Sequence, residues 1–394
     1  MAESAMTAPT DPSSPDGEIV TRATELVTLI REHAAQGDES RRVVPEVVRA
    51  LEDAGLFHLL VPQRWGGANA TIRTAVDVVS EVARGDGSAG WITSLLMTGA
   101  GYAATFSEQA QQEVFGANPR AKVGGVFTPG STSERVDGGY LVSGRWPYSS
   151  ASFVADWAIL GLLLEGDDPL GAALIPAEAF TIEPSWFMTG MKGTGSDTIV
   201  VEDHFLPDHR VQRFKDMAEA NFLSSDKEHR LTSVSLPGAA ALFLAAPQLG
   251  IGKHALEVTR AKLPGKPVAH TAYQQARLSP THHTLVAKAA TNLHLAELAL
   301  HRISLDLDQA CAARDLLTRG RIRNDTGAVA ELVSKAVDLL LTANGAGSFA
   351  EANVLSRIWQ DSSIAARHGY LTPEIGREAY GRLLLSHEEP TLSL

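Results

Sequence analysis

The stretch GRWPYSSASFVADWAIL, residues 144–160, changes character halfway along its length. Its second half is typical of a buried strand. Its first half sets Trp146, Tyr148, Ser149 and Ser150 close together, in a chain with only 6% aromatic residues. Because alternate strand residues share a face, we expect Trp146, Tyr148 and Ser150 on one side. Such a face is usually ordinary core, but a flat apolar wall ending in a hydroxyl would also suit a planar heteroaromatic ligand.

The region around this stretch, from about residue 121 to about residue 213, reads as a compact all-β module. Asp137-Gly138 lies between short extended runs and predicts a hairpin turn. GDDPLG, residues 166–171, predicts another turn. The segment GMKGTGS, residues 190–196, has neither a P-loop nor a dinucleotide-binding pattern. It is either a flexible connection between strands or a cradle whose hydroxyls, on Thr194 and Ser196, bind a cofactor.

Helical spacing dominates on both sides of this module. Before it, Pro45 is a plausible first helical residue with a stop near Gly55, and Ser88 and Ser107 are candidate helix caps. After it, residues 283–313 form one long amphipathic pattern, and a second pattern, stopped by Gly345, covers residues 328–345. Two shorter helices follow, at 354–371 and 373–385, so a bundle is expected. The fold class is therefore α+β, divided into a disordered tail (1–17), an N-terminal helical domain (18–120), a middle β-domain (121–215) and a C-terminal helical bundle (216–394).

Composition excludes several classes of partner. The formal net charge is −12 and no basic run exceeds two residues, so nucleic acid and anionic membranes are poor partners. No apolar run is long enough to cross a membrane. The single cysteine, Cys311, argues against disulfides and suits a cytoplasmic location. The 13 histidines show no metal-binding spacing, and His368, near the end of a predicted helix, is the one histidine that stands apart.

Five segments in the same order resemble the acyl-CoA dehydrogenase fold, with an N-terminal helical domain, a middle β-barrel domain and a C-terminal four-helix bundle. They are residues 41–70, 81–91, 144–160, 185–207 and 357–368. The chain is most similar to the oxygen-using branch of that fold, the group D two-component flavin-dependent monooxygenases. Within this branch the Trp-Pro-Tyr-Ser-Ser-Ala and Met-Lys-Gly-Thr-Gly-Ser segments look most like hydroxylases of aromatic polyketide antibiotic pathways.

The resemblance implies a site and a reaction. Reduced FMN, or FAD as the alternative, would react with O₂ to a C4a-hydroperoxide that hydroxylates an aromatic substrate of secondary metabolism. His368 and Ser150 would be catalytic, and Trp91 would contact substrate. Flavin-binding residues would be Trp146, Tyr148, Ser149, Ser150, Trp186, Thr194, Ser196 and Arg260, the last a candidate for the phosphate at a neighbouring subunit. A separate NAD(P)H-flavin reductase and a homotetramer are also implied.

Alternatives remain on the same scaffold. An N- or S-oxygenase would use the same flavin chemistry. In many dehydrogenases a catalytic glutamate occupies the place where this chain has His368 and Gly369, so the base for removing an acyl α-proton is missing there. Dehydrogenation is therefore discounted, and no residue favours a catalytically inactive scaffold protein.

Overall fold

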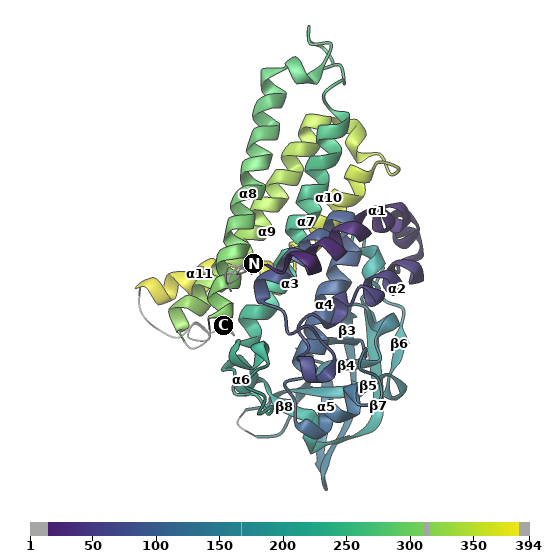
Figure 1. Ribbon diagram of the computed structural model, residues 1–394, viewed down its shortest axis with the longest axis vertical. Coiled ribbons are helices and arrows are strands. Elements are labelled where there is room, and N and C mark those ends of the chain that lie inside the picture. The colour runs from purple at the N-terminus through teal and green to yellow at the C-terminus, as the bar shows by residue number, and fades with distance from the viewer. Residues whose placement is uncertain (1–14, 167, 310–314, 386–394) are drawn as a thin grey trace, which may run out of the picture.

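The computed structural model describes residues 15–166, 168–309 and 315–385. In the order of the chain, helices come first, then strands, then longer helices (Figure 1). The sheets occupy one end of the molecule and the long helices project from the other. The expected tail lies mostly outside these residues, as does Cys311.

Five helices form the first part, and their ends follow local capping rules. Pro45 is the first residue of α2, and Gly55, with φ of 75°, follows its end. Ser107 caps α5 by accepting the N–H of Ala110. The cap of α4 is Asp86 and not the predicted Ser88, because the Asp86 carboxylate accepts the N–H of Ala89. The helices are α1 (Gly17–Ser40), α2 (Pro45–Asp53), α3 (Ile72–Gly85), α4 (Gly87–Ala103) and α5 (Glu108–Phe115).

The β region consists of two four-stranded sheets, ordered β1-β4-β5-β8 and β2-β3-β7-β6. Side chains of both sheets, Trp146, Leu160 and Val201 among them, share one buried cluster. The two sheets therefore pack against each other around a shared core. The predicted turn at Asp137-Gly138 is confirmed, with Gly138 at φ of 75°. The strands are β1 (Val123–Pro129), β2 (Ser131–Val136), β3 (Gly139–Ser149), β4 (Trp157–Leu163), β5 (Leu170–Pro176), β6 (Thr181–Glu183), β7 (Asp197–Pro207) and β8 (Val211–Arg213).

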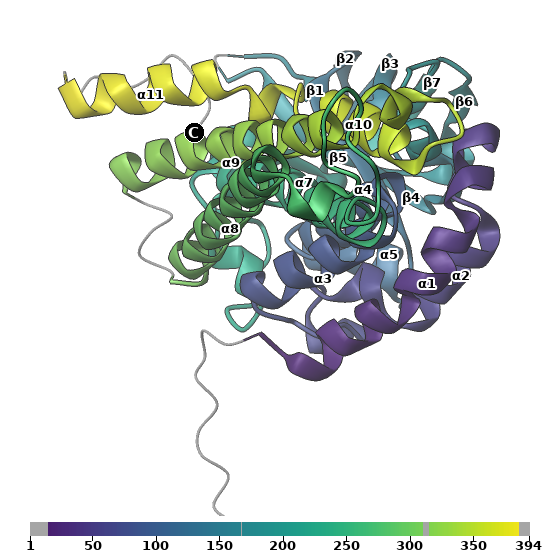
Figure 2. The same ribbon diagram turned by 90° about the horizontal axis from the view of Figure 1, so that it is seen from above.

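The last part is built on three long helices, with α11 extending to one side (Figure 2). Gly345, at φ of 75°, ends α9 as predicted. The pattern expected at 354–371 is shorter than predicted, because α10 ends at Ala365 and a short turn, η11, covers Gly369–Leu371. The helices are α6 (Phe214–Ala218), α7 (Leu236–Lys262), α8 (Pro280–Asp308), α9 (Leu316–Asn344), α10 (Val354–Ala365) and α11 (Pro373–Leu385).

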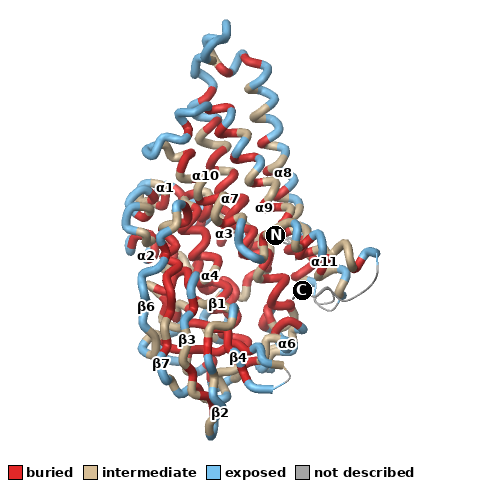
Figure 3. The backbone as a smooth tube through the Cα atoms, turned by 180° about the vertical axis from the view of Figure 1, so that it is seen from behind, coloured by how far each residue is buried: buried red, intermediate tan, exposed pale blue. Residues whose placement is uncertain are grey.

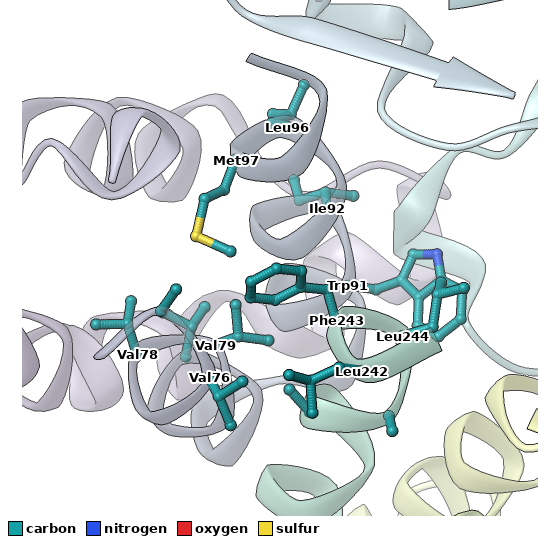
Figure 4. Packing of buried hydrophobic residues seen from close by; sticks show 14 of the residues in the cluster. Val76, Val78, Val79, Trp91, Ile92, Leu96, Met97, Leu242, Phe243 and Leu244 are labelled. Carbon is teal, nitrogen blue, oxygen red and sulfur yellow. The ribbon is translucent and has the colours of Figure 1, made fainter. Parts of the chain in front are cut away.

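The main core lies where α3, α4 and α7 pack together, and Figure 3 shows buried residues concentrated there. Gly250 permits the close approach, since a Cβ on it would lie 2.1 Å from the Ser80 carbonyl oxygen of α3. Figure 4 shows Trp91 and Val78 at opposite sides of this packing. Trp91 therefore sits at the border of the core, where a cavity begins. Within the described residues, no helix combines the length and apolar character that a membrane span requires.

Candidate active site

A cavity of about 870 Å³ lies where the three parts of the chain meet. The helix α4 contributes Trp91 and Tyr102, and the β region contributes residues 124–130 and Ser150. The bundle contributes Phe243 of α7 and the segment after α10. Most of its lining is apolar, and its size is within the range of ligand pockets in proteins.

The stretch of residues 144–160 contributes side chains to this cavity, but not in the strict two-residue alternation expected of a strand. Trp146 is buried between the sheets, where its Nε1 donates to the Gly161 carbonyl at 2.7 Å. Tyr148 is 62% exposed and has φ of 64°. The expectation that the two rings share a face is therefore wrong. The pairing of β3 with β7 shifts between Trp146 and Ser149, which ends the regular alternation.

The same shift separates the two serines. Ser149 is buried and donates to the carbonyl of Trp146 at 2.8 Å, so its hydroxyl closes the distortion and does not line the cavity. Ser150 does line it, as does Tyr148. Of the four residues singled out at the start, the structure thus brings Tyr148 and Ser150 to the cavity and uses Trp146 and Ser149 as core.

Ser150 belongs to a chain of hydroxyls that spans one wall. The indole N–H of Trp91 donates to Ser150 at 3.2 Å, Ser150 lies 2.6 Å from Ser196, and Ser196 lies 2.7 Å from Thr194. Thr194 donates to the Met191 carbonyl at 2.8 Å. Because the Thr194 hydroxyl already donates its proton to the Met191 carbonyl, Ser196 must donate to Thr194, and Ser150 must donate to Ser196. The serine hydroxyls therefore offer lone pairs, and no free proton, to a ligand.

The GMKGTGS segment is the ordered turn that holds this chain. It contains η5 (Lys192–Thr194), flanked by Met191 at φ of 51° and Gly195 at φ of 52°. Gly190 packs against α10, since a Cβ on it would lie 2.3 Å from the Gln360 carbonyl oxygen. The alternative of a flexible connection is therefore not what the structure shows, because close packing fixes the turn on both sides.

Trp186 stands beside this turn, held by groups that sequence reasoning missed. Its Nε1 donates to the Met191 carbonyl at 2.8 Å, and its ring meets that of Tyr148 edge-on with centroids 5.9 Å apart. Its backbone N–H donates to the buried Asp197 carboxylate at 3.0 Å. Asp197 in turn pairs with Arg42. The signal available in the sequence was the aspartate that directly follows Gly-Thr-Gly-Ser.

Behind the turn lie two buried carboxylates, Asp86 and Asp361. Asp361 accepts the backbone N–H of Met191 at 2.5 Å. Burial, followed by the charge of Asp86, raises the pKa of Asp361. Burial likewise raises the pKa of Asp86. These groups support the turn from the side away from the cavity.

His368 borders the cavity from the other direction. It caps η11, with its Nδ1 accepting the N–H of Tyr370 at 3.2 Å, so a neutral ring carries its proton on Nε2. Its ring centroid lies 5.9 Å from that of Trp91. The residue is exposed where it faces the open cavity, and the burial of the ring among nearby protein atoms, followed by the charge of Arg323, lowers its pKa to about 4. The helix α10, which carries Asp361, ends at Ala365, so His368 lies beyond it.

The remaining expected residues divide between cavity and surface. Trp91 lines the cavity as expected for a substrate contact. Arg260 lies exposed in the last turn of α7 and does not line the cavity of its own chain. Within the described residues, no cluster of three or more His, Cys, Asp or Glu side chains could hold a metal ion.

Comparison with known proteins defines the class of fold. The chain matches the acyl-CoA dehydrogenase N-terminal domain over residues 21–117 and the acyl-CoA dehydrogenase C-terminal domain over residues 242–373. The structure of XiaF from Streptomyces sp. in complex with FADH2 and glycerol superimposes with a TM-score of 0.89, at 31% identity, covering 96% of this chain and 97% of that one.

Relatives with the same fold define the family more closely. The chain is 30% identical over 370 residues to the oxygenase subunit HsaA of a flavin-dependent monooxygenase from Rhodococcus jostii, covering 91% of this chain and 96% of HsaA. It is 28% identical over 376 residues to the oxygenase component of the FADH2-dependent resorcinol hydroxylase from Rhizobium sp., covering 90% and 91%. The chain belongs to the oxygenase components of two-component flavin-dependent monooxygenases.

Proposed function

We propose that this oxygenase component hydroxylates an aromatic substrate of the polyketide type, with reduced flavin delivered by a separate reductase. The observation that carries the proposal is the position of Trp91, which contacts residues on two walls of one cavity. Its indole N–H meets the hydroxyl chain at Ser150, and its ring lies beside His368. A flavin edge and a substrate ring held between these walls would be close enough to react.

The residues present fit a flavin. The hydroxyls of Ser150 and Ser196 offer acceptors, and Trp186 and Tyr148 offer aromatic surface beside the turn. When bound, reduced flavin supplies the activation of dioxygen. FMNH2 is the form that the sequence resemblance implies. The names of resorcinol hydroxylase and of the XiaF complex specify FADH2, so FADH2 is the first form to test.

His368 has the character of a hydrogen-bond donor in this site. Its Nδ1 is occupied by the N–H of Tyr370, which leaves Nε2–H as the polar group free to face a ligand. With a pKa near 4 the ring is neutral at physiological pH. We therefore assign His368 the role of donating a hydrogen bond to an oxygen atom of the bound reactants.

The apolar wall has its own function. Leu95, Phe243 and Leu244 from α4 and α7 cover the cavity with side chains that offer no proton to a reactant. Excluding water protects reactive oxygen species from non-productive loss as hydrogen peroxide. A homotetramer and a cytoplasmic location complete the proposal and rest on the sequence resemblance.

The experiment is turnover of the purified chain with a flavin reductase, NADH, O₂ and either FAD or FMN, over a panel of mono- and polycyclic phenols. We expect hydroxylated product only when reductase and oxygenase are both present, and no NADH consumption by this chain alone. NADH oxidation by the chain itself, or acyl-CoA oxidation with an artificial electron acceptor in the absence of O₂, would contradict the proposal.

A further inference from the structure

The part of the cavity next to Gly369 and Tyr370 contains a polar group that the proposed reaction does not use. Arg323 of α9 lines the cavity and is buried, with 7% of its surface exposed. Its Nη2 donates to the Gly369 carbonyl at 2.6 Å, and its guanidinium lies over the ring of Tyr370. Its Nη1 is inaccessible to solvent and has no hydrogen-bond partner. A buried guanidinium with an unused donor is costly, so it calls for an explanation.

A second orphan donor lines the same cavity. Tyr102 of α4 lines the cavity, is 1% exposed, and its hydroxyl has no hydrogen-bond partner. Tyr370 also lines the cavity, and burial, followed by the charge of the ionised Tyr370 phenol, raises the pKa of Tyr102. Two phenols and a guanidinium therefore line the same cavity as His368, whose ring stacks on Tyr370.

The charge around the cavity has one sign. Its cationic lining residues are Arg145, Arg323 and Arg367, and no Asp or Glu is among the described residues that line it. Arg145 pairs with Glu183 at the surface, and Arg367 donates to the Ser363 carbonyl. Arg323 differs, since it has no carboxylate partner among the described residues and is shielded from water. This imbalance occurs in a chain with a net charge of −12.

We propose that Arg323, with Tyr102 and Tyr370, binds an anionic oxygen substituent of the aromatic substrate. A guanidinium matches a carboxylate or an ionised acidic hydroxyl in shape and charge, and a phenol adds a donor to the same oxygen. The inference rests on the proposed function for the aromatic part of the ligand. It adds that the substrate enters as an anion, with the charged group on the side of His368 away from the hydroxyl chain.

Two matched pairs of two-ring probes test the proposal by calorimetry on the full chain, loaded anaerobically with reduced FAD. For the carboxylate the pair is 6-hydroxy-2-naphthoate and 6-hydroxy-2-naphthamide. For the acidic hydroxyl it is 4-hydroxycoumarin and its methyl ether, which are not quinones and are not reduced by the flavin. We expect at least one anion to bind about 10-fold or more tightly than its neutral partner, and the better pair identifies the source of the charge. Equal affinities within both pairs, or no binding of either anion, would overturn the proposal.

Variants show which side chains cause the preference for the anionic probe over its neutral partner. Arg323→Met should abolish it while leaving reduced FAD affinity unchanged, and Arg323→Lys should retain part of it. Tyr102→Phe, which removes only a hydroxyl, should weaken the preferred anion several-fold even if Arg323→Met fails to fold. The assignment would be overturned if the preference for the anion were unchanged in both Tyr102→Phe and Arg323→Met. It would also be overturned if Arg323→Met lost only its affinity for FAD. If reduced FAD fails to bind the wild-type chain but the anion preference stands, the proposed function fails and this inference survives.

Discussion

The backbone N–H of Tyr370 donates to Nδ1 of His368, and this bond sets which ring nitrogen faces the cavity. The neutral ring must then carry its proton on Nε2. A histidine fixed in this way is prepared to donate a hydrogen bond, and it would have to change tautomer before it could remove a proton through Nε2. The relationship leads directly to two predictions.

Replacing His368 should uncouple oxygen use from hydroxylation. We expect His368→Ala to lower product formation about 100-fold, the size of effect typical of removing one positioned donor, while hydrogen peroxide rises. His368→Gln, whose amide can also donate, should lose less. Product and peroxide are measured together under single-turnover conditions. Near-wild-type product yield in His368→Ala would show that the residue has no part in the reaction.

The pH profile should show whether His368 stays neutral over the physiological range. With its pKa lowered to about 4, His368 stays neutral over the physiological range, so the ratio of product to peroxide should be flat between about pH 6 and 8. The ratio should fall only at more acidic pH. A change in this ratio near pH 6.5 in the wild type that is absent in His368→Gln would contradict the prediction. It would show that the imidazole titrates with an ordinary pKa.

The direction of the hydroxyl chain should favour reduced flavin, which carries an N–H at N5 where oxidised flavin has a bare nitrogen. Thr194→Val removes the acceptor at the end of the chain, so Ser196 can donate to Ser150 and Ser150 toward the ligand. We expect oxidised flavin to gain about 5-fold in affinity relative to reduced flavin, roughly one hydrogen bond. Fluorescence titration and anaerobic dialysis give the two affinities. Thr194→Ser is the matched control, and an unchanged ratio in Thr194→Val would refute the assigned direction.

The buried carboxylates predict how stability depends on pH. The folded pKa of Asp361 is raised, so the folded state holds a proton that the unfolded state releases, and stability falls as pH rises above about 4. Asp361→Asn cannot ionise and can still accept the N–H of Met191. Its melting temperature should therefore exceed that of wild type by a margin that grows with pH. A margin independent of pH would mean that Asp361 is ionised in the folded protein.

The long bundle predicts an assembly. Leu295 and Leu298 are 47% and 50% exposed on α8, which lies at the outer edge of the bundle in Figures 1 and 2. We expect light scattering to give four times the mass of one chain at micromolar concentration, and Leu295→Lys with Leu298→Lys to reduce it. A monomeric wild-type chain would contradict the homotetramer.

Local signals in the sequence were sufficient for much of this structure. Pro45 and Gly345 mark helix ends because their backbone preferences act within one turn. The turn at Asp137-Gly138 is equally local. The motif comparison also brought Trp91, Ser150 and His368 into one site, although they lie far apart in the chain.

The failures have a common physical origin, which is that tertiary contacts decided the outcome. Trp146 and Tyr148 separate because β3 shifts its register against a distant strand. Arg323 and Tyr102 belong to no motif, and only the folding of α9 and α4 around a shared space places them at one cavity. No pattern over a few residues carries that information.

Three parts of the chain meet around one cavity, so a ligand bound there would stabilise the contacts among them. A bound flavin would touch the N-terminal helices, the sheets and the bundle at once, so its binding free energy strengthens the contacts among all three. A ligand present at 100 times its Kd stabilises the folded state by about 2.7 kcal/mol. An oxygenase that receives its flavin from a reductase would then be more stable with flavin bound and less stable after the flavin leaves. The supply of reduced flavin would thereby influence how rigid the enzyme is.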